Sequence, residues 1–475
     1  MTWIHPLSAE TEESADVLGG KAHGLVVLRR LGLPVPDGFV IGTAACRAFL
    51  RDGRLPDGLG AELAAAVSGL EAATGRRLGG PERPLAVAVR SGGAVSMPGM
   101  MDTILNLGLT AGAAAGLAAE TGDQRFALDA RLRFLSGFAS VVLGLPPERL
   151  DAVVRGASAR ADGAAGEASG EEASGEEASG EGTRRTEADG EAARLTEAIR
   201  DVEALIRERT GEPVPDDATL QLEPAIRAVF SSWDTPRART YRDLHGVPHD
   251  LGTAVTVQAM VFGNRDDRSG SGVAFSRDPG TGERVPFGEV LFGRQGEEVV
   301  SGRSATRPLS ELAGREPEVW SRLLEALDRV EGHYRDACHV EFTFEAGELW
   351  ILQVRPGGLT GRAAVRVAVD LADAGVIGRR EALLRVAPHH LRYARTPRTE
   401  AADAADVLAR GLGACPGVAT GRVATTSDSA ARMAADGPVV LVRPHTSPLD
   451  MHGLAAAAGI VTAVGGPASH AAVVA

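Results

Sequence analysis

Residues 16–41 read DVLGGKAHGLVVLRRLGLPVPDGFVI and place a helix directly before a buried strand. Apolar side chains recur at helical spacing through AHGLVVLRRLGL, and the turn-forming PVPDG then leads into the apolar run FVI. The stretch also holds Lys21, the only lysine in a chain with 50 Lys and Arg side chains. Lys21 follows two glycines at the start of the helix, where backbone N–H groups and a compact ammonium group can meet a phosphate. A solvent-facing lysine at a helix start is the alternative, which the arginine bias weakens.

The bulk composition is that of a large globular protein with one unusual segment. The 475 residues are 44% hydrophobic, enough for a large interior and for two to four domains. The formal charge is −13, but residues 162–191 alone hold ten acidic and two basic side chains, a net of −8. The rest of the chain is therefore only mildly acidic, and it offers no basic face for nucleic acid.

The cysteines and the apolar runs bear on the compartment. Cys46, Cys338 and Cys415 lie far apart in the sequence, which argues against a disulfide framework and against a structural zinc site. No apolar run reaches the roughly 20 residues of a membrane span, and no signal peptide fits the N-terminus. We therefore expect a cytoplasmic protein without membrane contact.

The pattern along the chain predicts helices and strands in mixed order. A helix through TAACRAFLRDG should end at Gly53, and a helix at 225–247 should break near Pro236. We expect a disordered insert at about 156–190, because its GEASGEEASGEE repeat has almost no large apolar side chain to bury. Strand-type runs follow at 252–263, 270–279, 288–302 and 339–358, the last a hairpin turning at EAGE. A helical connector then precedes a second strand-rich block.

Four further side chains could carry chemistry. One lies at the end of an early strand, and three lie on the two strands of the predicted hairpin. Arg90 ends the run RPLAVAVR before Gly-Gly, where it could contact a phosphate or merely cap a sheet edge. Glu341, Gln353 and Arg355 lie on consecutive strands, and the last two share a face because strand side chains alternate. A carboxylate for Mg²⁺ beside an amide and a guanidinium suits an ATP polyphosphate. The alternative is the solvated face of a half-buried hairpin.

His470 lies in GGPASHAAVVA, after a Gly-Gly loop and a possible Ser469 N-cap. An imidazole at the start of a helix could carry a phosphoryl group, since the helix N-terminus favours negative charge. The alternative is a structural histidine.

Taken together, several motifs resemble those of the pyruvate, phosphate dikinase family in order and across nearly the whole chain. They are LGGKAHGLVVLRRLGLPVPDGFVI, VRSGGAVSMPGMMDTILNLGL, SSWDTPRARTYR, VQAMVFGN, GSGVAFSRDPGTGE, GEE, VEFTFE, LQVR, SPLDMHGL and GGPASHAAVVA. In that family an ATP-grasp domain passes the ATP β-phosphoryl group, as pyrophosphate, to a histidine on a swivelling domain. Inorganic phosphate then takes the terminal phosphoryl group, and the remaining phosphohistidine serves a C-terminal barrel that makes phosphoenolpyruvate from pyruvate.

The resemblance implies a role for each candidate residue. Lys21 and Arg90 would hold the ATP phosphates, and the SMPGMMDT loop around Gly99 would cover them. The rest of the nucleotide and Mg²⁺ site would be formed by four residues on the later strands, Glu297, Glu341, Gln353 and Arg355, with Glu341 as the metal ligand. His470 would be the phosphoryl carrier.

The fold implied is α/β (α+β), an ATP-grasp region with a helical insertion followed by a truncated, β-rich phosphohistidine domain. We predict five segments: an ATP-grasp N-terminal part at 1–110, a helical subdomain at 111–230, an ATP-grasp C-terminal part at 231–358, a helical linker at 359–405 and the truncated swivel domain at 406–475.

The chain also departs from the family pattern at several sites. Ala94 takes the place of an arginine, and His339 that of an acid two residues before the metal glutamate. His339 would alter Mg²⁺ binding, since hard cations prefer carboxylate oxygen. Gly358 and Leu359 replace a basic pair. Near the carrier, Pro467 and Ala468 replace Met-Thr, so the hydroxyl that is phosphorylated in plant members is absent.

The sequence ends five residues after His470, and from this we expect the barrel that binds pyruvate to be missing. The chain would then perform only the ATP and phosphate half of the dikinase reaction, would need a separate barrel chain as partner for the rest, and could be monomeric. An ATP-binding pseudoenzyme or regulatory module is the second interpretation, favoured by the lost charges. A phosphotransferase with another acceptor is the third interpretation, and no sequence feature supports it.

Overall fold

The computed structural model describes residues 2–95, 97, 99–168, 180–300, 305–359, 361–395, 407–411, 413–414, 417–446, 450–466 and 472, with the backbone alone at 158–168, 180–189, 297 and 300. The chain forms two compact units, Met1–His23 with Pro36–Met260, and Gly24–Val35 with Val261–Ala475. The boundary between them falls within helix α1 (Ala15–Arg30). The predicted α/β class is confirmed, whereas the finer division into five segments stays a prediction.

The first unit is built on an antiparallel five-stranded sheet in the order β1-β2-β7-β5-β6. Its strands are β1 (Ile4–Pro6), β2 (Gly38–Ile41), β7 (Thr253–Ala259), β5 (Val87–Gly93) and β6 (Thr103–Leu107). The strand expected after PVPDG is β2, and β7 joins it from more than 200 residues later in the chain. Such a pairing of distant segments buries apolar runs like VAV of β5 on both faces.

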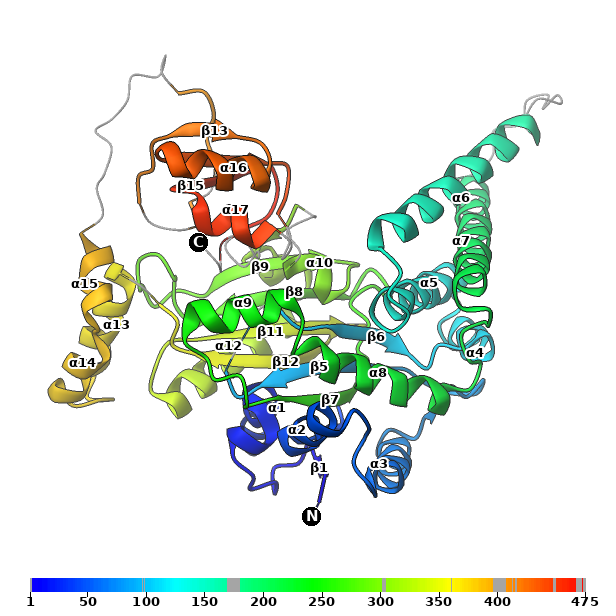
Figure 1. The fold of residues 1–475 in the computed structure, drawn as a ribbon, viewed down its shortest axis with the longest axis horizontal. Coiled ribbons are helices and arrows are strands. Elements are labelled where there is room, and N and C mark those ends of the chain that lie inside the picture. Colours follow the sequence, from blue (N-terminus) through cyan, green and yellow to red (C-terminus); the bar gives the residue numbers. More distant parts are fainter. Residues whose placement is uncertain are drawn as a thin grey trace. The chain divides into compact units, whose positions relative to one another are not determined.

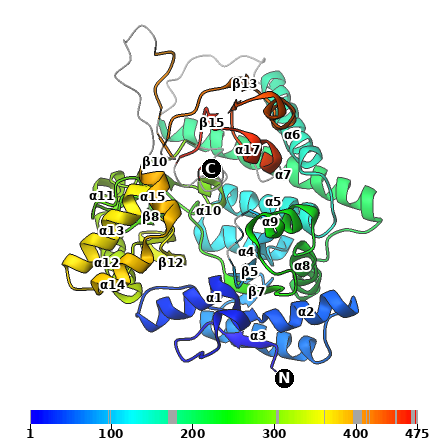
Figure 2. The same cartoon turned by 60° about the vertical axis from the view of Figure 1, so that its left-hand side comes forward.

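The first unit also contains helices, some of which pack on this sheet and others on neighbouring helices. They are α2 (Thr43–Asp52), α3 (Leu59–Thr74), α4 (Ala111–Thr121), α5 (Gln124–Val141), α6 (Pro147–Ala168), α7 (Gly180–Thr210), α8 (Ala218–Ser232) and α9 (Pro236–His245), and a small sheet pairs β3 (Arg77–Leu78) with β4 (Pro84–Leu85). Helix α2 ends at left-handed Gly53, and the break before Pro236 separates α8 from α9, both as predicted. Helices α6 and α7 run side by side in both views (Figures 1 and 2).

The second unit contains another antiparallel five-stranded sheet, in the order β10-β9-β8-β11-β12. Its strands are β10 (Arg307–Pro308), β9 (Phe287–Phe292), β8 (Gly270–Phe275), β11 (Cys338–Glu345) and β12 (Glu348–Pro356), and its helices are α10 (Gly296–Val300), α11 (Glu311–Arg315) and α12 (Pro317–Tyr334). Strands β11 and β12 are the predicted hairpin, with left-handed Ala346 and Gly347 in its turn. Helix α12 packs on both of these strands.

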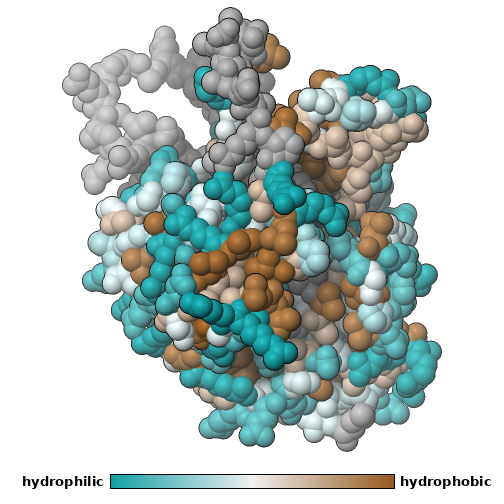
Figure 3. Space-filling view, turned by 90° about the vertical axis from the view of Figure 1, so that its left-hand side faces the viewer, coloured by the Kyte–Doolittle hydropathy of each residue, from teal (hydrophilic) through white to brown (hydrophobic). Residues whose placement is uncertain are grey.

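The helical connector consists of α13 (Gly361–Asp373), α14 (Arg379–Arg385) and α15 (Pro388–Ala394). Val367, Leu371 and Ile377 form its small core. Figure 3 looks onto the side of the molecule that includes these helices, where apolar residues gather at the surface. Leu383 and Leu384 of α14 are more than three-quarters exposed.

The strand-rich block that we expected near the C-terminus is instead a parallel arrangement with helices between its strands. Strands β13 (Arg422–Ala424), β14 (Val439–Arg443) and β15 (Gly459–Thr462) pair in parallel, and α16 (Ser427–Met433), a 3₁₀ turn (Ala434–Asp436) and α17 (Met451–Ala456) connect them. Parallel neighbours need a crossover segment, which is usually helical. Thr426 and Ser429 provide a capping box for α16, a start signal that the sequence analysis overlooked.

Two other expectations were wrong in part. The insert at about 156–190 was expected to be disordered, but α6 extends to Ala168 and α7 begins at Gly180, so its described parts are helical. The described parts of the insert, 156–168 and 180–190, contain Ala, Arg and Glu, which favour helix even where little can be buried. Residues 169–179 lie outside the described residues. The strand-type run at 288–302 ends at Phe292, where left-handed Gly293 leads into α10.

Within the described residues, no helix is both long and apolar enough to cross a membrane.

Candidate functional site

Two glycine pairs from distant parts of the sequence meet in the first unit. A Cβ atom built on Gly19 would lie 1.8 Å from the carbonyl oxygen of Gly92, and one on Gly20 would lie 3.3 Å from that of Ala94. Gly19 also interrupts α1, with φ of 76° and ψ of 151°. Glycine is required at Gly19 because the backbone of β5 occupies the space of a side chain. The LGGK and RSGG motifs are therefore in direct contact.

This contact brings Lys21 to the strand that carries Arg90. A Cβ atom on Gly92 would lie 3.4 Å from Cβ of Lys21, so the lysine stem lies over Gly92. Arg90 and Gly92 are two residues apart on β5 and share a face of the sheet. Lys21 and Arg90 thus place an ammonium and a guanidinium on one sheet face, an arrangement suited to a polyanion.

Arg90 pairs with Thr103 of β6 on one side and with Thr256 of β7 on the other. Thr256 is fully buried, and its Oγ1 has no hydrogen-bond partner among the described residues. A buried hydroxyl without a partner is costly unless a further group completes it. Thr256 belongs to this candidate site, although nothing in the sequence distinguished it from other strand threonines.

The methionine-rich loop that contains Gly99 is anchored by buried side chains before and after this glycine. Met97 and Met100 are buried, and left-handed Gly99 turns the chain between them. Arg237 at the start of α9 donates from Nε to the carbonyl oxygen of Met100 at 3.1 Å and forms an ion pair with Asp102. The sequence analysis did not single out Arg237, which lies 137 residues from Met100.

In the second unit, polar side chains form a row across the sheet. Glu341 of β11 lies opposite Gln353 of β12, and in the other direction the row continues through Val273 of β8 to Glu289 of β9. Residues opposite each other in a sheet point to the same face. Glu289 is 6% exposed and accepts a hydrogen bond from Thr306 Oγ1 at 2.7 Å. Only the strand register reveals that Glu289 joins the predicted pair.

A bulge sets the position of Gln353 within this row. The register changes between Glu341 and Phe342, which leaves Leu352 of β12 as the extra residue. Gln353 is 4% exposed, and its Oε1 has no hydrogen-bond partner in the described part of the chain. Arg355 Nη2 lies 3.7 Å from Glu341 Oε1, so the guanidinium belongs to the same face. The structure therefore brings Glu341, Gln353 and Arg355 together, of which strand alternation had predicted that Gln353 and Arg355 share a face.

His339 lies opposite Arg355 on this face. Burial, with the Arg355 guanidinium as a smaller cause, lowers the pKa of His339 to about 4. The imidazole is therefore neutral near pH 7 and adds no positive charge beside Glu341.

The oxygen atoms on this face suit a hard divalent cation such as Mg²⁺. Among the described residues no donor reaches the buried Gln353 Oε1, and the carboxylate-bearing Glu341 is its partner across the strands. No group of three or more His, Cys, Asp and Glu side chains gathers at one point in the residues that the structure describes. Mg²⁺ is commonly held by one or two carboxylates together with substrate phosphates, so a closed protein cage is not needed.

Two predicted residues cannot be placed in the same detail. Glu297 lies in α10, and the structure describes only the backbone of this residue. His470 lies outside the described residues. Lys21 and Arg90 belong to the first unit, whereas Glu341, Gln353 and Arg355 belong to the second.

Comparison with known proteins identifies the relatives of this chain. Residues 51–308 match the family model "Pyruvate phosphate dikinase, AMP/ATP-binding domain", and residues 435–475 match "PEP-utilising enzyme, mobile domain". The pyruvate, phosphate dikinase of Rhizobium meliloti (strain 1021) is 42% identical over 491 residues, which cover 100% of this chain and 52% of the relative. Pyruvate, phosphate dikinase 2 of Zea mays is 42% identical over 97% of this chain and 50% of the relative.

The chain spans about half the length of the curated relatives it matches. The nucleotide-domain model covers more than half of the chain, and the glycine motifs, the methionine-rich loop and the β11–β12 hairpin all lie in the aligned region. The chain belongs to the pyruvate, phosphate dikinase family.

Proposed function

We propose that this chain binds ATP with Mg²⁺ and transfers phosphoryl groups from it to His470. The observation that carries the proposal is the placing of Lys21 on the same sheet face as Arg90 through the contact of Gly19 with Gly92. Two cationic side chains from segments about 70 residues apart, held by glycines, suit the phosphates of a nucleotide. The family membership supports the same assignment.

In the proposed reaction, a nitrogen of the His470 imidazole attacks the β-phosphorus of ATP. The bond between the β-phosphorus and the oxygen that bridges it to the α-phosphorus breaks, and AMP leaves with that oxygen. Inorganic phosphate then attacks the terminal phosphorus of the pyrophosphorylated histidine, which releases pyrophosphate and leaves phosphohistidine. Phosphoenolpyruvate formation would require a PEP/pyruvate-binding barrel that accepts this phosphoryl group.

The residues of both units have separate tasks in this proposal. Lys21 and Arg90 bind the polyphosphate and balance its charge as AMP departs. The loop around Gly99 covers the phosphates, and Arg237 keeps the end of that loop in place through Asp102 and Met100. Glu341 and Gln353 would hold Mg²⁺, which when bound supplies charge neutralisation at the phosphoryl oxygens. Glu297 and Arg355 would contact the nucleotide from the second unit.

The test uses ATP labelled with ³²P in the β-position. The purified chain is incubated with this ATP and Mg²⁺, and acid-labile, alkali-stable label on the protein is counted. We expect label on the wild type and none on His470→Ala. His452→Ala is the matched control, because His452 is an exposed histidine in the same C-terminal region that pairs with Asp428 at 2.8 Å. Label that persists in His470→Ala, or its absence from a wild type that binds ATP, would contradict the proposal.

A further inference from the structure

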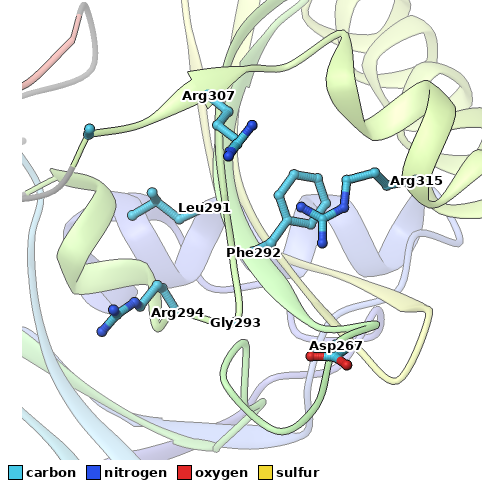
Figure 4. A pocket seen from close by; sticks show the side chains of 8 residues that line it. Asp267, Leu291, Phe292, Gly293, Arg294, Arg307 and Arg315 are labelled. Atoms are coloured by element: carbon cyan, nitrogen blue, oxygen red, sulfur yellow. The ribbon is translucent and has the colours of Figure 1, made fainter. Parts of the chain in front are cut away.

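A second cationic pocket lies in the second unit, at the end of β9. It has a volume of about 470 Å³. Its walls come from separate segments: Asp267 before β8, Phe292 and Arg294 at the end of β9, Arg307 in β10, and Arg315 at the end of α11 (Figure 4). Three guanidinium groups against one carboxylate leave a net charge of +2 on these walls. The cluster is notable in a chain whose formal net charge is −13.

Arg315 is held by an aromatic ring and not by an acid. Its guanidinium carbon lies 3.8 Å from the centroid of the Phe292 ring. Phe292 in turn packs edge-on against the buried Phe344, with 5.9 Å between the ring centroids. Within the described residues Arg315 has no carboxylate partner. Stacking uses the flat face of a guanidinium, so its in-plane N–H groups stay available to an anion.

The other two arginines are held only by weak ion pairs. Arg307 pairs with Glu311 at 3.0 Å and Arg294 with Glu298 at 3.5 Å, and both guanidinium side chains are more than half exposed. Exposed pairs of this kind contribute little to stability, because solvent screens them. A multivalent anion can therefore compete with these carboxylates for both guanidinium groups.

The strand register separates this pocket from the carboxylate row. Arg307 lies opposite Val290, which alternates with Glu289 along β9 and so points to the other face of the sheet. Phe292 lies opposite Gly270, which pairs with Phe344, on the face away from Glu341. The arginines therefore do not belong to the face that carries Glu341 and Gln353.

We propose that this pocket is a second anion site, which binds a small molecule carrying two or more phosphoryl groups. Several guanidinium groups around one pocket favour an anion with several acceptor oxygens over a single carboxylate. The volume is larger than one phosphate needs and lies in the range of small-molecule sites. The pocket and its ligand are independent of the phosphoryl transfer to His470.

The probe is inorganic pyrophosphate, titrated calorimetrically into the full chain without nucleotide. Lys21→Ala serves as the background, because it weakens the candidate nucleotide site and leaves the arginine pocket intact. We expect pyrophosphate to bind this protein, and its affinity to fall about tenfold for each of Arg307→Ala and Arg315→Ala. Arg315→Lys keeps the charge but loses the stacked, planar guanidinium. Its affinity for pyrophosphate should therefore lie between that of the Lys21→Ala background and that of Arg315→Ala.

Arg322→Ala is the control for the change in net charge, since Arg322 is an exposed arginine on α12 outside the pocket. Its affinity should match that of the Lys21→Ala background. Orthophosphate is the second probe and should bind at least tenfold more weakly than pyrophosphate. The proposal is overturned if the Lys21→Ala background does not bind pyrophosphate, if Arg307→Ala and Arg315→Ala bind it as well as Arg322→Ala, or if both probes bind equally.

Discussion

The candidate phosphate-binding residues of the first unit and the candidate metal-binding residues of the second are positioned in different ways. In the first unit, backbone contact between Gly19 and Gly92 positions Lys21. This contact is possible only because Gly19 has no side chain. In the second unit, the side chains of Glu341 and Gln353 are placed by strand register, and any residue that tolerates a strand could occupy their positions. Substitutions at the glycine contact of the first unit should therefore affect folding together with function, whereas substitutions at Glu341 and Gln353 should affect function and leave the fold intact.

The largest effect is expected for Gly19→Ala. The new methyl group would meet the Gly92 carbonyl oxygen at 1.8 Å, and left-handed φ adds strain. Strand β5 cannot retreat, because β6 and β7 pair with it on both sides. The free energy of unfolding should fall by roughly 3 kcal/mol or more. Denaturant titration measures it.

Gly53→Ala is the matched control for this change, since Gly53 has φ of +71° but nothing within 4 Å of the added Cβ. It should cost about 1 kcal/mol, the cost of the backbone conformation alone. Equal losses in the two variants would show that close approach of the backbones does not matter at Gly19.

The next effect concerns binding. Lys21→Ala should lower the affinity for ATP at least tenfold, which is about 1.4 kcal/mol, while the unfolding transition stays unchanged. Lys21→Arg should recover only part of this affinity, because a planar fork cannot replace a compact ammonium over Gly92. Calorimetric titration with ATP measures both. Unaltered ATP affinity in folded Lys21→Ala would refute the assignment of the phosphate site.

A smaller effect, of opposite sign on stability and binding, is expected at Gln353. Gln353→Leu removes a buried oxygen that has no hydrogen-bond partner among the described residues, so the free protein should be as stable as the wild type or more stable by up to about 1 kcal/mol. Its affinity for ATP should fall in the presence of Mg²⁺ and change little in its absence.

Gln221→Leu provides the contrast, since Gln221 is equally buried but both of its polar atoms are hydrogen-bonded, to Gly108 and to Pro215. That variant should lose about 1–3 kcal/mol of unfolding free energy. A similar loss in Gln353→Leu would mean that the Gln353 oxygen is satisfied in solution.

The smallest expected effect concerns the reactivity of two buried thiols, Cys46 in the first unit and Cys338 in the second. Burial raises the pKa of Cys46 to about 12 and that of Cys338 further. In a Cys415→Ser protein, neither thiol should react with a disulfide reagent at pH 8 until its unit opens. Labelling under increasing denaturant would report which unit opens first. Immediate reaction of either thiol in the folded protein would contradict the burial.

The same thiols give a direction for pH. The folded state keeps these protons above pH 9, the ordinary pKa of the thiol, while the unfolded state releases them. The unfolded state then binds fewer protons, so stability should fall as the pH rises above about 9. Cys46→Ala should flatten this part of the stability curve.

Local features of the sequence were sufficient where one short segment carries all the information. The helix end at Gly53, the break before Pro236 and the hairpin turn at Gly347 each follow from backbone preferences of the residues at that point. The sharing of one face by Gln353 and Arg355 was also within reach, because strands alternate with a fixed period, whereas the bulge at Leu352 decides that Glu341 lies opposite Gln353. Composition misjudged the described ends of the insert, 156–168 and 180–190, where helix propensity and burial point in opposite directions.

Periodicity and turn chemistry, which are local, were enough to predict the strand hairpin and to nominate candidate phosphate and metal residues, while the α/β class followed from the motifs shared with a known family. Only the tertiary structure decided that Gly19 contacts Gly92, that Glu289 joins the row of Glu341, and that three arginines surround one pocket. Each of these contacts joins segments far apart in the chain. Their positions depend on which strands become neighbours in the sheet, and that choice is made by burial of the whole core and not by any one segment.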